Sequence, residues 1–428
     1  MREKQRAELH KTIWSIANEL RGSVDGWDFK AYILITLFYR FISEDITSYI
    51  NAKESNVNTQ DFDYAKLDDA TAQNAKDALI KAKGYFILPS ALFSNLIARI
   101  KKDNIFAQNE LNQELKRVFQ AIEGSSIGSP SERNFKSLFD DFKFNDKALG
   151  NSVIEQNKKL AKVLFAIDAL DFGDIKAGSI DLFGDAYEYL MRMYASNAGK
   201  SGGEYFTPQE VSKLLASITA HNQSEVNKVY DPACGSGSLL LQVAKILGIK
   251  NITKGFFGQE KNLTSYNLCR MNMLLHRINF DKIFIAHGDT LLNPEPSHKA
   301  NEPFDIIVSN PPYSTKWEGA DNVSLMRDTR FTPAGALAPK SKSDLAFVMH
   351  ILSWLSVKGT AAIVEFPGVL YRSGAEATIR KYLVSENYID CVIQLPENLF
   401  FGVSIATCII VIKKNKKDTK TLFINASN

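Results

Sequence analysis

Residues 228–238 read Lys-Val-Tyr-Asp-Pro-Ala-Cys-Gly-Ser-Gly-Ser, and this stretch is the clearest indication of the fold class. A short strand signal, Lys228–Tyr230, enters a glycine loop, and a helical pattern begins at Ser238. Gly235 and Gly237 allow the backbone to turn tightly and to approach a ligand closely. A strand that leads through such a loop into a helix begins a βαβ unit, and ligands of open α/β sheets bind where the strands end.

The same alternation of short apolar runs and helical patterns continues along the chain. The expected strands are 255–259, 283–286, 304–309, 360–366, 389–395 and 405–413. One expected helix follows 255–259 and runs through Leu275, and two others span 344–355 and 376–383. Strands that alternate with helices indicate a mostly parallel, doubly wound sheet. The last two strands are too close in sequence for a parallel crossover, so we expect them to pair antiparallel.

The first part of the chain has a different period. Up to residue 170, apolar residues recur every three or four positions, as in Leu92, Phe93, Leu96, Ile97 and Ile100. This spacing predicts helices. We therefore expect an α + α/β protein, with a helical N-terminal domain over 1–170 and an α/β domain over 171–428. The polar, glycine-rich tract 196–203 is expected to be a flexible connection.

The composition is that of an ordinary soluble globular protein. The chain has 428 residues, of which 45% are apolar and 23% charged, and this length predicts two or three domains. A net charge of +3 permits nucleic-acid binding, but it implies that phosphate contacts are shared with a partner. The four isolated cysteines predict reduced thiols, no metal site and a cytoplasmic protein. No apolar run is long enough to predict a membrane span.

The glycine loop lacks the marks of the common nucleotide-binding loops. Leu240 stands where a dinucleotide fingerprint needs its third glycine, and no Gly-Lys-Ser/Thr follows as in a P-loop. Asp231, which opens the loop, suits a cationic amino acid group better than a phosphate. The other interpretation of the loop is a simple tight turn between a strand and a helix.

Two acids follow the next two expected strands. Glu260 directly follows 255–259 and can accept hydrogen bonds from both hydroxyls of a ribose. Asp289 follows 283–286 and can accept a hydrogen bond from the amino group of an adenine. Either acid can instead stabilise the start of a helix or turn, and the sequence leaves both interpretations open.

The stretch Ser309-Asn-Pro-Pro-Tyr313 is the most informative in the chain. Two prolines directly after a buried strand fix the backbone and remove two donors. Asn310 Oδ1 and the Pro311 carbonyl are then rigid acceptors, and an aromatic ring follows at once. This arrangement suits a planar amine that donates to both oxygens while Tyr313 stacks on its ring. The other interpretation is a rigid turn with a core tyrosine.

Together these stretches resemble motifs of the amino-methyltransferases that modify DNA bases, which have a Rossmann-like class I methyltransferase sheet. The resemblance implies S-adenosyl-L-methionine as cofactor and adenine N6 as the methyl acceptor. The implied catalytic residues are Asn310, Pro311, Pro312 and Tyr313. The implied cofactor-binding residues are Glu204, Tyr205, Phe206, Thr207, Pro208, Gln209, Asp231, Gly235, Ser236, Gly237, Ser238, Glu260 and Asp289. By local pattern, residues 203–210 also predict a helix start, with Thr207 as N-cap and Pro208 at the first position.

The N-terminal sequence makes the resemblance more specific. Residues 5–18, 21–30 and 37–43 resemble the helical domain of modification subunits of type I restriction–modification systems. The family implies several partners: double-stranded DNA, a specificity subunit that reads the target, a second modification subunit and a restriction subunit. Such subunits usually continue past Ser427 with a helical tail that helps grip the specificity subunit, so this tail is expected to be missing here.

The resemblance implies in-line methyl transfer, with Asn310 as acceptor and without a covalent intermediate. The target adenine must leave the duplex to reach such a pocket, and Phe366 or Tyr371 is expected to form its second wall. The long segment 314–343 is expected to be a lid or a DNA-contacting segment.

Further along, a basic run begins at Lys413 and is completed by Lys414, Lys416 and Lys417. It is expected to form a solvated turn, with phosphate contact as the alternative.

Two other functions are weighed against this one. A protein-glutamine or RNA amino-methyltransferase uses a similar Asn-Pro-Pro-Tyr loop, but the long helical N-terminal half argues against it. A catalytically silent scaffold that binds cofactor and partner is the second alternative, and the intact stretch 310–313 argues against it.

Overall fold

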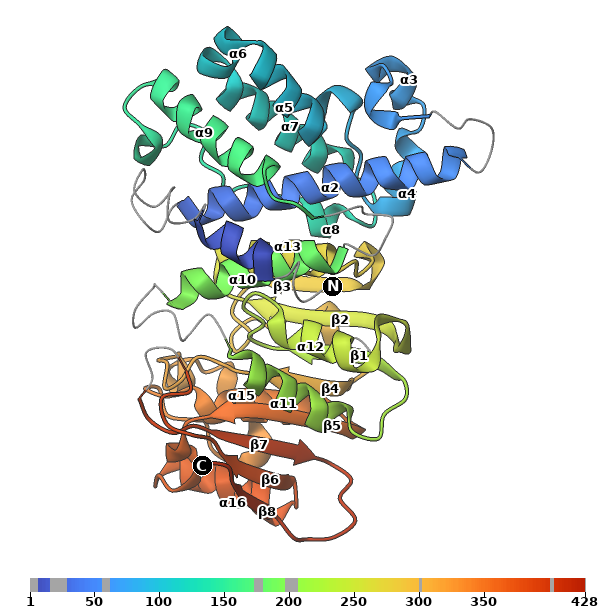
Figure 1. Ribbon diagram of the computed structural model, residues 1–428. Coiled ribbons are helices and arrows are strands. Elements are labelled where there is room, and N and C mark those ends of the chain that lie inside the picture. Colours follow the sequence, from blue (N-terminus) through green and yellow to red (C-terminus); the bar gives the residue numbers. More distant parts are fainter. Residues whose placement is uncertain are drawn as a thin grey trace. The chain divides into compact units, whose positions relative to one another are not determined.

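The computed structural model describes residues 7–15, 29–55, 62–172, 180–196, 207–299, 302–400 and 404–427. The chain forms two compact units (Figure 1). One unit comprises residues 1–194 with 271–281, and the other comprises 195–270 with 282–428. The helix α13 (Leu263–Leu275) therefore contributes residues to both units. The domain boundary at 170/171 remains a prediction.

The described residues of the first unit are helical or lie in turns and loops. After a helical stretch at 7–15, the helices are α2 (Phe29–Ser55), α3 (Asp69–Gln73), α4 (Lys76–Lys83), α5 (Phe93–Lys102), α6 (Asn104–Asn109), α7 (Leu111–Ser125), α8 (Glu132–Phe135), α9 (Val153–Asp168) and α10 (Ile180–Ser196). Phe38 and Tyr39 on α2 are completely buried. Arg40 on α2 donates hydrogen bonds to the carbonyl oxygens of Ile167, in the last turn of α9, and of Leu170, just beyond it. The helical prediction for this region is confirmed.

The second unit is built on one eight-stranded sheet. Its strands are β1 (Val226–Asp231), β2 (Ile252–Glu260), β3 (Ile283–His287), β4 (Phe304–Ser309), β5 (Leu355–Glu365), β6 (Ile389–Gln394), β7 (Cys408–Lys413) and β8 (Leu422–Asn425). The spatial order is β3-β2-β1-β4-β5-β7-β6-β8. The first five strands run parallel, and β7 pairs antiparallel with both β5 and β6. The predicted mostly parallel sheet with an antiparallel C-terminal pair is confirmed.

Helices cover both faces of this sheet, as in a doubly wound fold. Helices α11 (Gln209–Ala220) and α12 (Ser238–Leu247) lie over one face (Figure 1). Apolar side chains of α15 (Asp344–Trp354) and α16 (Ala375–Ser385) share a buried cluster with Tyr230 and Phe304 of the sheet. A short helix, α14 (Pro296–Lys299), precedes β4.

The strand order reverses beside β1, and this reversal positions the functional site. The chain leaves β1 toward β2 and β3 on one side and later places β4 on the other side. The carboxyl ends of adjacent parallel strands meet at one edge, and ligands of doubly wound sheets bind in the crevice at such a switch point. The glycine loop, Asp289 and the stretch 310–313 follow β1, β3 and β4, and Glu260 ends β2, so all of them lie at this edge.

Among the described residues, no helix combines the length and the apolar character needed to cross a lipid bilayer.

Candidate active site at the carboxyl ends of the strands

The side chain of Asn310, directly after β4, is held at both ends of its amide. Asn310 Nδ2 donates to Thr207 Oγ1 at 3.0 Å, and Tyr313 Oη donates to Asn310 Oδ1 at 2.5 Å. A carboxamide oxygen has two lone pairs, so Oδ1 keeps one for a further donor. Burial raises the pKa of the Tyr313 hydroxyl well above its ordinary value, which keeps this group a donor at neutral pH. The contacts leave Oδ1 as an oriented acceptor.

A second contact joins the turn after β4 to the glycine loop after β1. Ser309 Oγ donates to Asp231 Oδ1 at 2.9 Å, and the Ala233 amide donates to the same oxygen at 3.0 Å. Asp231 is 1% exposed, and this burial raises the pKa of its carboxyl to about 7. The Asn-Pro-Pro-Tyr turn and the glycine loop therefore lie at the same edge of the sheet, bridged by a buried carboxyl group.

The glycine loop is shaped by two residues with positive φ. Gly235 and Gly237 have φ values of 52° and 80°, which residues with a Cβ atom rarely adopt. Gly237 is the N-cap of α12, which begins at Ser238, and Ser236 between the two glycines is almost fully buried. The backbone thus turns sharply from β1 into α12.

Glu260, the last residue of β2, is tied to this loop. Its Oε2 accepts from the Gly235 amide at 2.9 Å, and its Oε1 accepts from the Asn262 amide at 2.7 Å. Burial raises the pKa of Glu260, while these amide hydrogen bonds lower it. Each carboxylate oxygen retains acceptor capacity, so the pair of oxygens can still accept hydrogen bonds from two neighbouring hydroxyls.

Asp289 caps a turn after β3, which agrees with the alternative interpretation that this acid stabilises the start of a turn. Its Oδ1 accepts from the amides of Leu291 and Leu292 at 3.0 and 3.3 Å. Its Oδ2 accepts from Lys261 Nζ at 2.9 Å and retains room for a second donor. Because Glu260 on β2 pairs with His287 on β3, the two acids leave neighbouring strand ends.

The start of α11 corrects one prediction. Thr207 is not the N-cap; the helix begins at Gln209, with Pro208 as N-cap and without a side-chain cap. The extended backbone of Pro208, with ψ of 142°, delays the helix by one residue. The Thr207 hydroxyl is then available to Asn310. The predicted cofactor residues Glu204, Tyr205 and Phe206 lie outside the described residues, as does 197–203 of the predicted flexible tract.

Comparison with known proteins decides which family has this arrangement. The family model for N-6 DNA Methylase matches residues 178–428, and the model for the HsdM N-terminal domain matches residues 9–167. The chain belongs to the N-6 DNA methylase family. It is 50% identical to the type I restriction enzyme MpnII methylase subunit of Mycoplasma pneumoniae, over 100% of this chain and 80% of that protein.

Solved structures agree with this family membership. The methyltransferase subunit of a type I restriction-modification system from Streptococcus thermophilus superimposes with a TM-score of 0.86 at 35% identity, over 98% of this chain and 87% of that chain. A Listeria monocytogenes protein described as a class I S-adenosylmethionine-dependent methyltransferase shares the fold, with a TM-score of 0.51 at 18% identity, over 78% of this chain and 93% of that chain. The chain is therefore a type I methylase subunit by family and a class I methyltransferase by fold.

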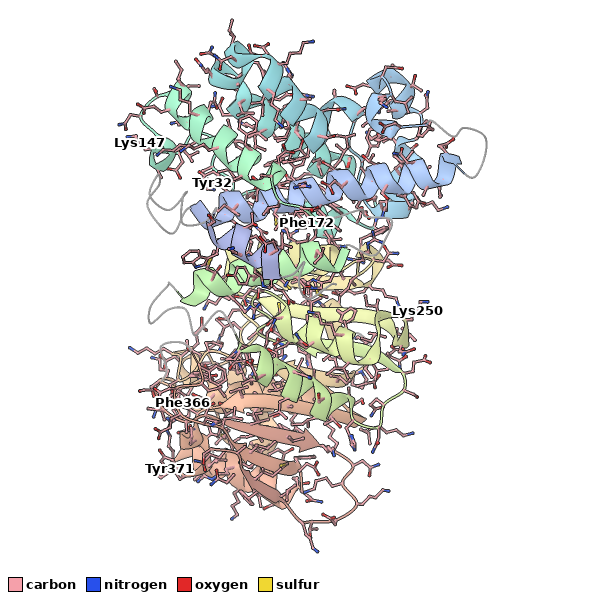
Figure 2. The ribbon with its side chains drawn as sticks, viewed as in Figure 1. Tyr32, Lys147, Phe172, Lys250, Phe366 and Tyr371 are labelled. Carbon is pink, nitrogen blue, oxygen red and sulfur yellow. The ribbon has the colours of Figure 1, made fainter. Side chains whose placement is uncertain are left out.

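Aromatic residues enclose the methylase motif tyrosine. The Tyr313 ring contacts Phe366 and Phe400 edge-on, with centroid distances of 5.2 and 6.1 Å. Phe366 and Tyr371 both follow β5 (Figure 2), but the Tyr371 side chain is 76% exposed. Of the two candidates for a second wall, Phe366 is therefore the one that adjoins Tyr313. Phe400 was missed because it lies in a loop without periodicity.

Two buried acids beside the same methylase motif were also missed. Asp344 Oδ1 accepts from the Ser314 amide at 3.1 Å. Glu365 ends β5, and burial, followed by the charge of Asp344, raises its pKa well above the ordinary range. Glu365 also raises the pKa of Tyr313. The sequence signal that could have identified Glu365 was an acid near the end of the apolar run 360–366.

The connection from β4 to α15 and the basic run near the C-terminus are largely held by internal contacts. In the connection, Trp317 Nε1 donates to the Pro339 carbonyl at 3.1 Å and its ring packs on Phe331. In the basic run, Lys413 pairs with Asp390 at 2.7 Å, and Lys414 and Lys416 donate to backbone carbonyls. These contacts favour the solvated turn over phosphate contact.

In the described parts of this methylase, no group of three His, Cys, Asp or Glu side chains gathers as a metal site requires.

Proposed function

We propose that this chain methylates the N6 amino group of adenine in double-stranded DNA, with S-adenosyl-L-methionine as methyl donor, as the modification subunit of a type I restriction–modification complex. The observation that carries the proposal is the Asn310 side chain, held with a free acceptor site beside the glycine loop. Family membership supports the same reaction.

The residues at the strand ends fit the proposed cofactor. Asp231 offers a buried negative charge to the cationic methionine end, and the glycine loop allows a close backbone approach. Glu260 offers two oxygens to the ribose hydroxyls, and Asp289 Oδ2 offers an acceptor to the adenine amino group. Residues 204–209 are proposed to cover the methionine end. When bound, this cofactor supplies a methyl group on a positively charged sulfur, and the neutral thioether that remains after transfer is a good leaving group.

The protein must compensate for a poor nucleophile, because adenine N6 shares its lone pair with the ring. Asn310 Oδ1 and the Pro311 carbonyl are proposed to accept both N6 hydrogens and to stabilise the positive charge that develops there. Preorganised groups of this kind each contribute about 10²–10³-fold in rate. Tyr313 is proposed to stack on the base, and its hydroxyl keeps Oδ1 oriented. The methylated amine then loses its proton without a strong base.

The substrate must be presented by partners. Adenine N6 is stacked and paired in a duplex, so the base is proposed to swing out into the pocket. We propose that a specificity subunit reads the target sequence, that a second modification subunit completes the grip on DNA, and that a restriction subunit joins the full complex. The net charge of +3 supports shared phosphate contacts. This assignment places the protein in the cytoplasm.

Transfer of labelled methyl groups tests the substrate class. The chain is purified with its specificity subunit and offered duplex DNA, RNA and protein in parallel, and the product is identified by mass spectrometry. The proposal predicts N6-methyladenine in DNA. Label in glutamine residues or RNA would support the alternative amino-methyltransferases, and cofactor binding without transfer to any substrate would support a silent scaffold.

A further inference from the structure

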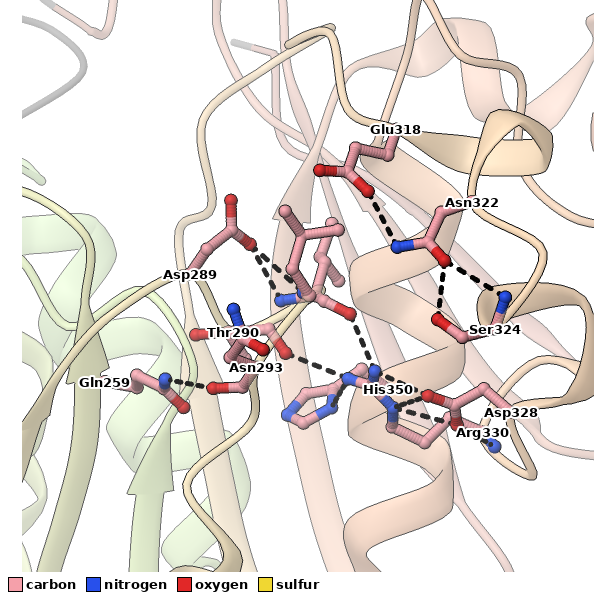
Figure 3. Close-up of polar contacts among 12 residues, drawn as sticks. Gln259, Asp289, Thr290, Asn293, Glu318, Asn322, Ser324, Asp328, Arg330 and His350 are labelled. Atoms are coloured by element: carbon pink, nitrogen blue, oxygen red, sulfur yellow. Dashed lines mark hydrogen bonds and ion pairs between the residues drawn. The ribbon is translucent and has the colours of Figure 1, made fainter.

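Arg330 is the best-satisfied charged group in the connection between β4 and α15. Its side chain is 4% exposed. Its Nη1 donates to the Thr290 carbonyl at 2.9 Å and to His350 Nδ1 at 3.1 Å, and its Nη2 donates to the Leu291 carbonyl at 2.6 Å. The remaining donors, on Nε and Nη2, bond Asp328 at 2.7–3.1 Å. All five N–H groups of a guanidinium therefore have partners (Figure 3).

The partners of Arg330 come from separate parts of the second unit. Because arginine only donates, His350 Nδ1 must accept, so the histidine carries its proton on Nε2. That nitrogen lies 3.1 Å from Tyr230 Oη on β1, the residue before Asp231. Arg330 thus links its own connection to α15, to β1 and to the turn after β3. The role of 314–343 as a lid or a DNA-contacting segment stays a prediction, but the Arg330 guanidinium itself is occupied by these internal partners.

The carbonyls that Arg330 holds belong to the turn that begins with Asp289. From the opposite side, Gln259 on β2 donates through Nε2 to the Asn293 carbonyl at 2.8 Å (Figure 3). Thr290 Oγ1 also donates to the Pro232 carbonyl at 2.6 Å. The turn is therefore clamped on two sides, and the Asp289 carboxylate is placed by the backbone between the clamps.

Removal of the guanidinium leaves two buried carbonyls without donors. Unsatisfied buried polar groups cost more than the hydrogen bonds themselves contribute, so the turn has to move to regain partners. A lysine cannot replace the arginine, since an ammonium has three donors and no planar fork. The position of Asp289 therefore depends on Arg330.

We propose that Arg330 is a positioning residue for recognition of the cofactor's adenine, acting through the Asp289 turn. This inference rests on the proposed function, in which Asp289 accepts a hydrogen bond from the 6-amino group. A 6-oxo purine presents a carbonyl oxygen at that place and faces the carboxylate unfavourably. Arg330 then determines how strongly the protein prefers a 6-amino over a 6-oxo purine.

The test compares the affinities of S-adenosylhomocysteine and S-inosylhomocysteine by calorimetry. In the wild type we expect the adenosyl probe to bind at least about tenfold more tightly. Arg330→Lys keeps the charge and is expected to lose most of this preference, chiefly through weaker binding of the adenosyl probe. Arg327→Lys is the matched control, because Arg327 is an exposed arginine in the same connection, and it is expected to keep the wild-type ratio.

The inference is overturned if the affinity ratio in Arg330→Lys equals the wild-type ratio; if both probes then bind more weakly by the same factor, Arg330 only stabilises the fold. If Arg330→Lys does not fold, Asp328→Asn loosens the same guanidinium from the more exposed side and must reduce the ratio. Asp289→Asn distinguishes a failure of the Arg330 inference from a failure of the proposed cofactor role. A wild type without preference, or an Asp289→Asn variant that keeps it, contradicts the proposed cofactor role itself.

Discussion

The two sides of the strand reversal hold their polar groups in different ways. On the β4 side, Asn310 is fixed by the side chains of Thr207 and Tyr313. On the β2–β3 side, Glu260 and Asp289 are fixed largely by backbone amides. The direct donors to the two acids are thus mostly backbone amides, and Arg330 acts on Asp289 only through the backbone of its turn, whereas the Asn310 amide depends directly on the identity of its side-chain partners.

This contrast has a chemical reason within the proposed function. The carboxylates on the β2–β3 side need a position, and a carboxylate accepts equally well through either oxygen. The amide of Asn310 has distinct ends, and a half-turn would present its NH₂ group to the substrate amine. The two side-chain contacts are therefore expected to matter most where orientation matters, and the variants below test that expectation.

Asp231 bridges the two sides, and its charge is expected to have the largest effect among these variants. Asp231→Asn keeps an oxygen for Ser309 and Ala233 but removes the negative charge that is proposed to face the cationic methionine end of the cofactor. We expect the affinity for S-adenosylmethionine to fall about 10–100-fold, the range of a hydrogen bond to a charged group. Asp305→Asn, near the other end of β4, is the control. Equal affinity in the two variants would remove Asp231 from the cofactor site.

The same carboxyl predicts a pH dependence. Burial raises the pKa of Asp231 to about 7, so the cofactor-free carboxyl is largely protonated at pH values below that. Cofactor affinity is expected to fall about tenfold from about pH 8 to about pH 6 in the wild type and to change little in Asp231→Asn. Because the folded pKa lies above the unfolded value, this group's contribution to stability is present at low pH and is lost as pH rises through about 7. Urea unfolding of both proteins measures that difference, and parallel pH profiles would contradict the assignment.

Thr207 tests the side of the comparison that depends on side chains. Thr207→Val leaves Asn310 Nδ2 without its acceptor and allows the amide to rotate. We expect kcat to fall about tenfold, with a small change in the KM for cofactor, and Thr207→Ser to restore the rate. A raised cofactor KM with unchanged kcat would mean that Thr207 serves the cofactor alone.

Lys261 tests the side that depends on the backbone, and the expected effect is the smallest. Its Nζ lies 2.9 Å from Asp289 Oδ2, but its side chain is 76% exposed. Lys261→Ala is expected to change cofactor affinity by less than about threefold, because exposed ion pairs contribute little and the Leu291 and Leu292 amides still hold Asp289. A larger loss, measured by the same calorimetry, would show that the Asp289 carboxylate also depends on a direct side-chain contact.

The sequence predicted well those features that local chemistry determines. The strand 304–309 was predicted with its observed bounds, because an apolar run is stopped by Asn310 and two prolines. The switch from helical to alternating period separated the two kinds of architecture. The glycine loop and the acids were found because they end strands, and parallel strands end at a common edge.

The missing features depend on contacts between distant segments. The hydrogen bond from Asn310 to Thr207 joins residues 103 positions apart, and no local pattern encodes it. The strand β8 is exposed along its length and forms because the edge of β6 is open to it, not because its residues alternate. The internal role of Arg330 was not predicted, because the carbonyls that it binds lie on another loop, 39 and 40 residues earlier in the chain.

In the proposed reaction, the Asn310 amide accepts hydrogen bonds from the substrate amine beside a bound methyl donor. Single-turnover methylation of duplex DNA by Asn310→Ala and Asn310→Asp, with S-adenosylhomocysteine binding measured in the same preparations, tests it most directly. We predict a loss of at least about 10²-fold for Asn310→Ala, partial activity for Asn310→Asp, which keeps an acceptor oxygen, and cofactor binding within about threefold of the wild type. A wild-type methylation rate in Asn310→Ala would exclude the Asn310 amide from the proposed reaction.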